Sequence, residues 1–228
     1  MEEIIQLKDV SQHFKMGDSI VRALSHINLD IYAKELTALV GPSGSGKSTL
    51  LNVVGGLTKP TEGEVFIYNT NVTHYTEDQM CFFRRDHIGF IFQSFNLNST
   101  LTALENVTMP LIFSRIPNKD REKMASEALD LVGLKDRKDH KPGQLSGGQQ
   151  QRVSVARAIV NKPKIILCDE PTGNLDSKTG KEILELIKEM NRIHQITFII
   201  VTHDSNVANQ CQRRIWIQDG KICKDERN

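Results

Sequence analysis

The sequence predicts an α/β fold with a mostly parallel central sheet. The first observation is the segment 36–54, where the apolar run Leu36–Val40 is followed by the glycine-rich loop Gly41–Thr49 and then by a helical pattern. The second is a set of continuous apolar runs, Ile88–Phe92, Ile165–Cys168 and Ile196–Val201. Continuous runs of this kind are typical of parallel strands that are buried on both faces.

The loop has the sequence pattern of a phosphate-binding loop. Its glycines let several backbone N–H groups point inward, and the helix that follows adds the positive end of its dipole. Lys47 is expected to reach the β- and γ-phosphates, Ser48 to bind Mg²⁺ and Thr49 to lie near the α-phosphate. The alternative is a glycine-rich turn with an exposed lysine, but this motif occurs by chance in only about 1% of chains of this length. The predicted loop residues are Gly41, Pro42, Ser43, Gly44, Ser45, Gly46, Lys47, Ser48 and Thr49.

Length and composition narrow the class of protein. The chain has 228 residues, which suits one large domain or one domain with a small subdomain. A net charge of +1 offers no electrostatic footprint for nucleic acid or an anionic membrane. The four cysteines form no CxxC pair, and no apolar run approaches the roughly 18 residues of a membrane span. Any role at a membrane is therefore expected to depend on a partner protein.

The remaining elements are assigned from periodicity and turn residues. We expect short strands at 4–10, 27–31 and 64–68, with a turn at 61–63. Helices are expected at 76–85, at 104–112 with an interruption at Pro110, at 121–132 with Gly133 as its cap, and at 150–160. The chain should end in a hairpin with a type I′ turn at Asp219-Gly220, followed by a frayed tail at 224–228.

Polar residues follow three of the apolar strands, at the edge where open α/β sheets bind ligands. Gln93 follows Ile88–Phe92, Asp169 and Glu170 follow Ile165–Cys168, and His203 lies just after Ile196–Val201. Asp169 is expected to hold Mg²⁺ through water beside Ser48, and Glu170 to orient and deprotonate the attacking water. The alternatives are a loop glutamine, a structural histidine and a solvated acidic turn.

A glycine-containing helix start precedes the predicted helix 150–160. Ser146 and Gln149 match a capping box, so a capped helix without further function is one interpretation. Gly147 and Gly148 destabilise a helix by roughly 1 kcal/mol each, and they leave backbone N–H groups accessible. The second interpretation is therefore a contact with phosphate.

These motifs occur together in one family, and the chain resembles the ATP-binding subunit of an ABC transporter along almost its whole length. The match comprises a Walker A loop at 41–48, a Q-loop glutamine at 93, a signature at 145–149, a Walker B strand at 165–169 followed by Glu170, a D-loop at 174–176 and an H-loop histidine at 203. Phe14 falls where the family places an aromatic residue that stacks on adenine, although spacing alone favours a core or edge residue.

The resemblance implies a P-loop NTPase fold in a single domain, 1–228. It implies an N-terminal antiparallel β subdomain, with a core over about 1–92 and 160–228, and an inserted helical subdomain over about 94–159. The implied ligands are ATP and Mg²⁺. The implied catalytic residues are Lys47, Glu170 and His203, and the implied metal-binding residues are Ser48, Gln93 and Asp169. Besides the loop residues given above, nucleotide contacts are implied for Phe14, Gln93, Ser146, Gly147, Gly148 and Gln149.

The implied partners are integral membrane permease subunits and a second copy of the chain, in a head-to-tail dimer that forms with ATP, and no nucleic acid. The chain would lie on the cytoplasmic side of the membrane, attached through the permease. Within the family it looks like the lipoprotein-releasing and macrolide-export branch, as in LSGGQQQRVSVARA and DEPTGNLDSKTG. Departures are Lys34 in place of glycine, Cys168 in place of alanine, and Asn98-Ser99 in place of a more apolar pair.

Two rival functions remain open. The first is an ATPase of the same fold that transmits force to a membrane partner, or senses with it, without moving a substrate. The second is a soluble ATPase of DNA repair or translation, which the near-neutral charge and the lack of a coiled-coil insertion disfavour.

Overall fold

The computed structural model describes residues 2–17 and 19–227, and the chain divides into two compact units. The first unit comprises residues 1–84 and 196–228, and the second comprises residues 85–195. The second unit extends beyond the range 94–159 expected for a helical subdomain, because it also includes two strands and the helix Ser177–His194. The expected subdomain boundaries stay a prediction.

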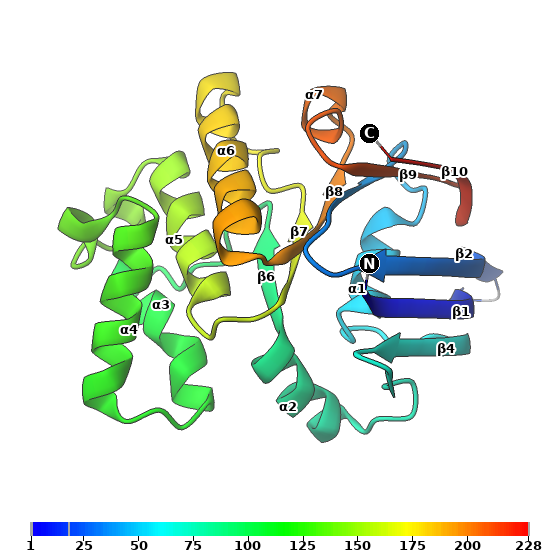
Figure 1. Cartoon of the computed structure of the whole chain (residues 1–228), viewed down its shortest axis with the longest axis horizontal. Coiled ribbons are helices and arrows are strands. Elements are labelled where there is room, and N and C mark those ends of the chain that lie inside the picture. The colour runs from blue at the N-terminus through cyan, green and yellow to red at the C-terminus, as the bar shows by residue number, and fades with distance from the viewer. Residues whose placement is uncertain (1, 18, 228) are drawn as a thin grey trace. The chain divides into compact units, whose positions relative to one another are not determined.

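An antiparallel sheet forms one part of the first unit, with strand order β2-β1-β4-β5. Figure 1 shows β1, β2 and β4 side by side. Their bounds are Glu3–Met16 for β1, Ser19–Tyr32 for β2, Glu62–Ile67 for β4 and Thr70–Asn71 for β5. The prediction of two short strands at 4–10 and 27–31 is wrong in extent, because β1 and β2 form one long hairpin whose register shifts are absorbed by bulges. The turn expected at 61–63 is also partly strand.

Parallel strands form the other sheet of the first unit. β3 (Leu36–Val40) pairs in parallel with both β8 (Thr197–Thr202) and β9 (Arg213–Gln218), and β10 (Lys221–Arg227) pairs antiparallel with β9. The helix α1 (Lys47–Val54) contacts β8 and β2, and the short helix α7 (Ser205–Ala208) contacts β3 and β8. The predicted mostly parallel α/β arrangement is confirmed.

The C-terminal hairpin has the predicted turn but not the predicted end. Asp219 and Gly220 have φ angles of 49° and 73°, as a type I′ turn requires. The expectation of a frayed tail is wrong for residues 224–227, because β10 continues to Arg227. Asp225 holds it there by accepting two hydrogen bonds from Arg213, at 2.8 and 2.6 Å. Asn228 lies outside the described residues.

The second unit combines a parallel strand pair with a group of helices. β6 (Ile88–Phe92) and β7 (Ile165–Asp169) are paired in parallel. The helices α3, α4 and α5 pack against one another, and α5 also contacts β6 and α6, as Figure 1 shows in green to orange. Their bounds are Ala103–Phe113 for α3, Asn118–Leu131 for α4, Gly147–Ile159 for α5 and Ser177–His194 for α6. Short 3₁₀ turns occupy Lys135–Arg137 and Pro142–Gln144.

Four helices differ from the predictions; one of them, α4, begins at Asn118 instead of at residue 121. α3 continues through Pro110, because Val107 and Leu111 are both fully buried and hold the two sides of the proline in one helix. α5 begins at Gly147 rather than at residue 150, so both glycines of the signature lie inside the first turn. α2 covers Glu77–His87. Gly133 follows α4 with a φ of 74° and confirms the predicted left-handed cap.

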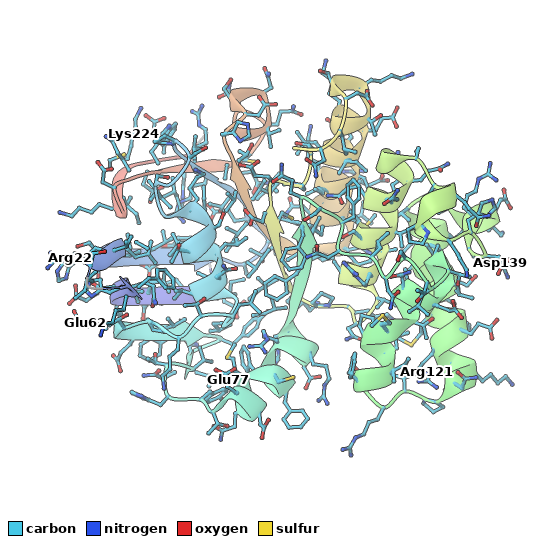
Figure 2. The ribbon with its side chains drawn as sticks, turned by 180° about the vertical axis from the view of Figure 1, so that it is seen from behind. Arg22, Glu62, Glu77, Arg121, Asp139 and Lys224 are labelled. Carbon is cyan, nitrogen blue, oxygen red and sulfur yellow. The ribbon has the colours of Figure 1, made fainter. Side chains whose placement is uncertain are left out.

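Each unit has its own apolar interior. Val10, Leu24, Ala38, Leu50 and Phe198 are 0% exposed in the first unit, and Leu111, Leu129, Val153, Ile166 and Ile183 are 0% exposed in the second. Charged side chains of both signs project from the surfaces of both units, including Arg22, Glu62, Asp139 and Lys224 (Figure 2). The buried side chains form a well-packed core in each unit. Such a core fixes the strands, and therefore the polar residues that follow the strand ends.

Candidate functional site

The glycine loop leads directly into the start of α1. Gly46 is the cap residue of this helix and, as a glycine, provides no side-chain cap for the first turn. Its φ of 102° and the position of Ala23 O, 2.5 Å from where a Cβ would stand, both require glycine. Because the backbone N–H groups at a helix start point along the helix axis toward its positive dipole end, the chemistry of this segment fits a phosphate.

Lys47 adds a full positive charge at the same place. Its side chain is largely buried, and Nζ donates to Gly41 O at 2.8 Å, to Pro42 O at 2.6 Å and to Ser45 Oγ at 3.4 Å. These acceptors all belong to the loop, so the ammonium group lies within the ring of backbone that a phosphate would enter. The loop residues predicted from the sequence thus occur together on one short segment.

The register of β3 and β8 brings a second predicted residue to the same sheet edge. Val40 and Thr202 are register partners, so Gly41 and His203 each follow the end of adjacent parallel strands. His203 is exposed at this edge. Phe14, on β1, has 40% of its side chain exposed, which excludes the interpretation as a core aromatic.

The second unit repeats this arrangement with the other pair of strands. Phe92 and Asp169 are register partners, so Gln93 and Glu170 follow the ends of β6 and β7. Glu170 has a φ of 47°, an uncommon conformation for a residue other than glycine, at which the chain leaves the sheet in a turn closed by Gly173 N donating to Glu170 O at 3.0 Å. Strained backbone of this kind is often found at functional sites.

The side chain of Gln93 rests on this turn. Its amide donates to Asn174 Oδ1 at 3.3 Å, and Asn174 Nδ2 donates to Gln93 O at 3.0 Å. A Cβ on residue 173 would lie 2.7 Å from Gln93 Nε2 and 3.2 Å from a Glu170 carboxylate oxygen. The sequence motif included Asn174 but indicated no role for it, and its contact with Gln93 has no signal in the sequence.

The start of α5 contains the predicted capping box. Gln149 N donates to Ser146 Oγ at 3.3 Å, and Ser146 N donates to Gln149 Oε1 at 3.0 Å. The two glycines differ in surroundings. Gly147 is exposed, whereas Gly148 is buried and a Cβ there would clash with the methyl group of Thr179. The accessible helix start therefore centres on Gly147.

Asp176 caps the next helix. Its carboxylate accepts hydrogen bonds from the backbone of Lys178 and Thr179 and, at 2.6 Å, from the Thr179 hydroxyl. The hydroxyl bond is the main cause that lowers the pKa of the Asp176 carboxyl. The carboxylate therefore stays ionised at neutral pH as the N-cap of α6, beside Gly148.

Arg157 is a site-related residue that the motif analysis missed. From α5 it donates to Phe95 O at 2.7 Å and to Asn96 O at 2.5 Å. Both acceptor residues have positive φ, 61° and 50°, so the guanidinium holds an unfavourable loop conformation just after Gln93. Burial lowers the pKa of this arginine. Its type alone, in a helix with other polar residues, indicates nothing about this contact.

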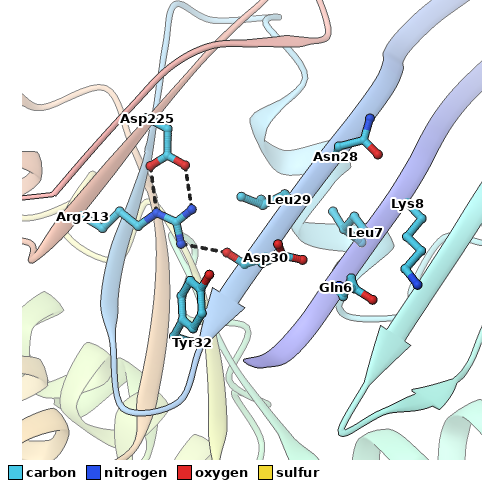
Figure 3. Close-up of a pocket in the computed structure, with 9 residues that line it drawn as sticks. All are labelled: Gln6, Leu7, Lys8, Asn28, Leu29, Asp30, Tyr32, Arg213 and Asp225. Atoms are coloured by element: carbon cyan, nitrogen blue, oxygen red, sulfur yellow. Dashed lines mark hydrogen bonds and ion pairs between the residues drawn. The ribbon is translucent and has the colours of Figure 1, made fainter. Parts of the chain in front are cut away.

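A polar cavity of about 320 Å³ lies in the first unit, and none of the residues that line it is a predicted site residue (Figure 3). Arg213 borders it and is tied to Asp225 and to Asp30 O, the latter at 2.7 Å. These bonds connect β2, β9 and β10, so the polar groups at this side of the cavity have a structural role. Its lining residues are Gln6, Leu7, Lys8, Asn28, Leu29, Asp30, Tyr32, Arg213 and Asp225.

The described residues contain no group of three or more His, Cys, Asp or Glu side chains arranged to hold a metal. Mg²⁺ commonly binds proteins through only one or two side chains and takes its other ligands from water and phosphate, so the hydroxyl and carboxylate chemistry of Ser48 and Asp169 fits this ion. Over the same described ranges, 2–17 and 19–227, the helices are too short or too polar to cross a membrane.

The family model for ABC transporters matches residues 24–173 of this chain. The chain is 50% identical to the uncharacterised ABC transporter ATP-binding protein MJ0796 of Methanocaldococcus jannaschii, over 98% of this chain and 97% of that protein. The chain belongs to the ABC transporter family. It is an ABC-type ATPase, whose ligands are ATP and Mg²⁺.

The name of a second relative includes a permease as well as an ATP-binding part. The chain is 48% identical to the macrolide export ATP-binding/permease protein MacB of Vibrio parahaemolyticus, covering 99% of this chain but only 34% of MacB. Among solved structures, a dimeric post-hydrolysis state of the MJ0796 cassette bound to ADP and Pi matches with a TM-score of 0.91 at 49% identity, over 98% of both chains. The fold and the motifs thus agree with an active cassette of this family.

Proposed function

We propose that two copies of this chain enclose two ATP molecules head to tail, and that the cycle of closing and hydrolysis drives a membrane permease that exports its substrate. The observation that carries the proposal is the likeness to the dimeric MJ0796 cassette bound to ADP and Pi, which extends over 98% of this chain. Export is supported by MacB, whose name joins an ATP-binding part with a permease.

The proposed roles follow the local chemistry of each residue. Lys47 and the backbone of Gly41–Thr49 bind the phosphates, and Phe14 stacks on adenine. Glu170 accepts the proton of the attacking water and His203 orients the γ-phosphate. The start of α5, with Ser146, Gly147, Gly148 and Gln149, binds the nucleotide held by the other copy.

Three residues are proposed to hold the metal: Ser48, Gln93 and Asp169. When bound, Mg²⁺ neutralises the charge of the phosphates. Gln93 also connects the proposed metal site to the loop at Phe95 and Asn96, which Arg157 holds in place. In this proposal the chain lies at the cytoplasmic face of the membrane, bound to the permease.

The experiment replaces Glu170 by Gln and measures hydrolysis and oligomeric state together. The amide keeps the size of the side chain but cannot accept the proton, so ATP turnover should fall by about 100-fold or more. ATP binding should persist, and size-exclusion chromatography with ATP should show a stable dimer that the parent forms only transiently.

Lys47→Ala is the control, because it should weaken nucleotide binding, abolish hydrolysis and leave the protein monomeric with ATP. A Glu170→Gln variant that turns over ATP at the parent rate would show that the proposed base is wrong.

To test coupling to a membrane partner, the permease is co-purified with this protein and substrate export is measured. ATP turnover that changes with the permease, without any exported substrate, would favour the force-transmitting alternative.

A further inference from the structure

One buried polar side chain of the second unit is not explained by the site as described above. Gln151 lies on α5, one turn after the capping box, and is 0% exposed. Most residues that fill such positions are apolar, because a buried amide must find hydrogen-bond partners for all its polar atoms. Its contacts therefore need a physical reason.

The amide of Gln151 reaches both strand ends of the second unit. Nε2 donates to Pro171 O at 2.6 Å and lies 3.5 Å from Phe92 O, the weaker of the two contacts. Phe92 immediately precedes Gln93, and Pro171 immediately follows Glu170. A single side chain thus touches the backbone next to the proposed metal-binding amide and next to the proposed base.

The oxygen atom of the Gln151 amide differs from the nitrogen in its hydrogen bonding. Gln151 Oε1 is buried and has no hydrogen-bond partner among the described residues. Such a position is unfavourable for stability, since methionine or leucine would fill the same space without an unpaired polar atom. A role in packing alone does not account for glutamine here.

We propose that Gln151 is a positioning residue for hydrolysis, which transmits the position of α5 to Gln93 and Glu170. This inference rests on the proposed roles of Glu170 and of the start of α5. Gly147, where α5 begins, is proposed to meet the nucleotide of the other copy, and Gln151 follows it by about one helical turn on the same rigid element. When α5 moves to meet that nucleotide, Gln151 moves the carbonyl groups beside Gln93 and Glu170 with it.

The contact of Gln93 with Asn174 is consistent with the proposal that movement of α5 changes the position of Gln93. Asn174 holds Gln93 from the side of the turn, through bonds of 3.3 and 3.0 Å, and Gln151 holds the preceding residue from the side of α5. Gln93 is therefore fixed between two elements, and a displacement of α5 changes its backbone position directly. Small misplacements of reacting groups lower the rate of the chemical step more than they lower binding.

The test replaces Gln151 by Met, which keeps the volume and removes the hydrogen bonds. We expect kcat for ATP hydrolysis to fall roughly tenfold or more, while KM for ATP changes less than about twofold, because the phosphate loop is untouched. The melting temperature should stay close to that of the parent, since an unpaired buried oxygen is removed together with the bond to Pro171. A kcat within twofold of the parent in the folded variant would overturn the proposal.

Gln150→Met is the matched control. The neighbouring glutamine donates to Leu145 O, at 3.1 Å, at the start of its own helix, so this variant should keep the parent kcat. An equal loss of kcat in both variants would overturn the proposal, because the effect would then come from α5 in general.

Gln151→Asn provides a second variant in case the Met protein does not fold. The shorter side chain keeps a buried amide but cannot reach Pro171 O from the same backbone, so the same loss of kcat is expected. Full activity of the Asn protein would overturn the proposal. The proposed function itself is checked separately, because Glu170→Gln must inactivate the parent; a failure there concerns the base and not Gln151.

Discussion

The exposure of Phe14 excludes a core position and leaves two interpretations, an edge aromatic and a residue that stacks on adenine. Spacing alone favours a core or edge aromatic, but 40% of this side chain is exposed. A single exposed hydrophobic residue is common on protein surfaces, so the exposure of Phe14 is compatible with the proposed stacking on adenine but also with an edge position. Its register partner on β2 is Val21, which is 44% exposed and offers no aromatic face.

Phe14→Ala should therefore weaken ATP binding and reduce the preference for adenine. Stacking of a base on an aromatic ring contributes about 1–3 kcal/mol, so the Kd for ATP should rise on the order of tenfold. Titration with ATP and GTP measures both effects. Val21→Ala is the control and should leave both Kd values unchanged. Equal ATP affinity of the Phe14→Ala variant and the parent would show that Phe14 does not contact the base.

At the scale of elements, β10 is held by an ion pair that crosses the last hairpin. Arg213 is almost completely buried and binds Asp225 through two hydrogen bonds and Glu35 at 3.3 Å. The bonds to Asp225 are the main cause that raises the pKa of the guanidinium. A bidentate pair with one buried partner is stronger than an ordinary surface ion pair, and it fixes β10, the edge strand that pairs with β9.

Asp225→Ala should destabilise the protein through this strand. Removing a partner of a buried cation costs about 1–3 kcal/mol here, because Asp225 itself is 40% exposed and Glu35 remains. Thermal unfolding followed by circular dichroism should show a melting temperature lower by roughly 2–10 °C. Glu226→Ala on the same strand is the control, since Glu226 has no fully buried partner: its bond to Arg214 is long, at 3.5 Å, and its ion pair with Lys224 is solvent-exposed. Equal melting temperatures for Asp225→Ala and the parent would show that the pair contributes nothing.

At the scale of the whole molecule, each nucleotide in the proposed reaction is bound by residues of two copies of the chain. The phosphate loop is in the first unit and the glycine-containing start of α5 is in the second. Each unit has a pair of parallel strands whose last register partners lie next to proposed site residues, Val40 with Thr202 and Phe92 with Asp169. The proposal requires the start of α5 to serve the nucleotide of the other copy.

Ser146→Arg tests this requirement. A bulky cation at the start of α5 should block closure, so hydrolysis and dimer formation with ATP should be lost while the Kd of the monomer for ATP stays within about twofold. Size-exclusion chromatography with ATP measures dimer formation in the Glu170→Gln background, where the dimer is stable, and a turnover assay of the Ser146→Arg variant at several protein concentrations measures hydrolysis.

Thr102→Arg is the matched control, because Thr102 caps α3 with the same kind of capping box, formed with Glu105. Loss of either cap costs about 0.5–2 kcal/mol of stability, so only the effect on the dimer should separate the two variants. If Ser146→Arg in the Glu170→Gln background dimerises at the same protein concentration as Glu170→Gln alone, the head-to-tail arrangement is contradicted.

The local features of the chain were accessible from the order of residues. Gly41–Thr49, the apolar strands and the Ser146 capping box depend on neighbours in the chain, so their patterns predicted β3, β6 and the capped start of α5. Contacts between distant segments left no such pattern. The pairing of Arg213 with Asp225 turned an expected frayed tail into β10, and the amide of Gln151 joined Phe92 to Pro171. Packing decided these contacts, because a buried polar group takes whichever partner the folded backbone brings within reach.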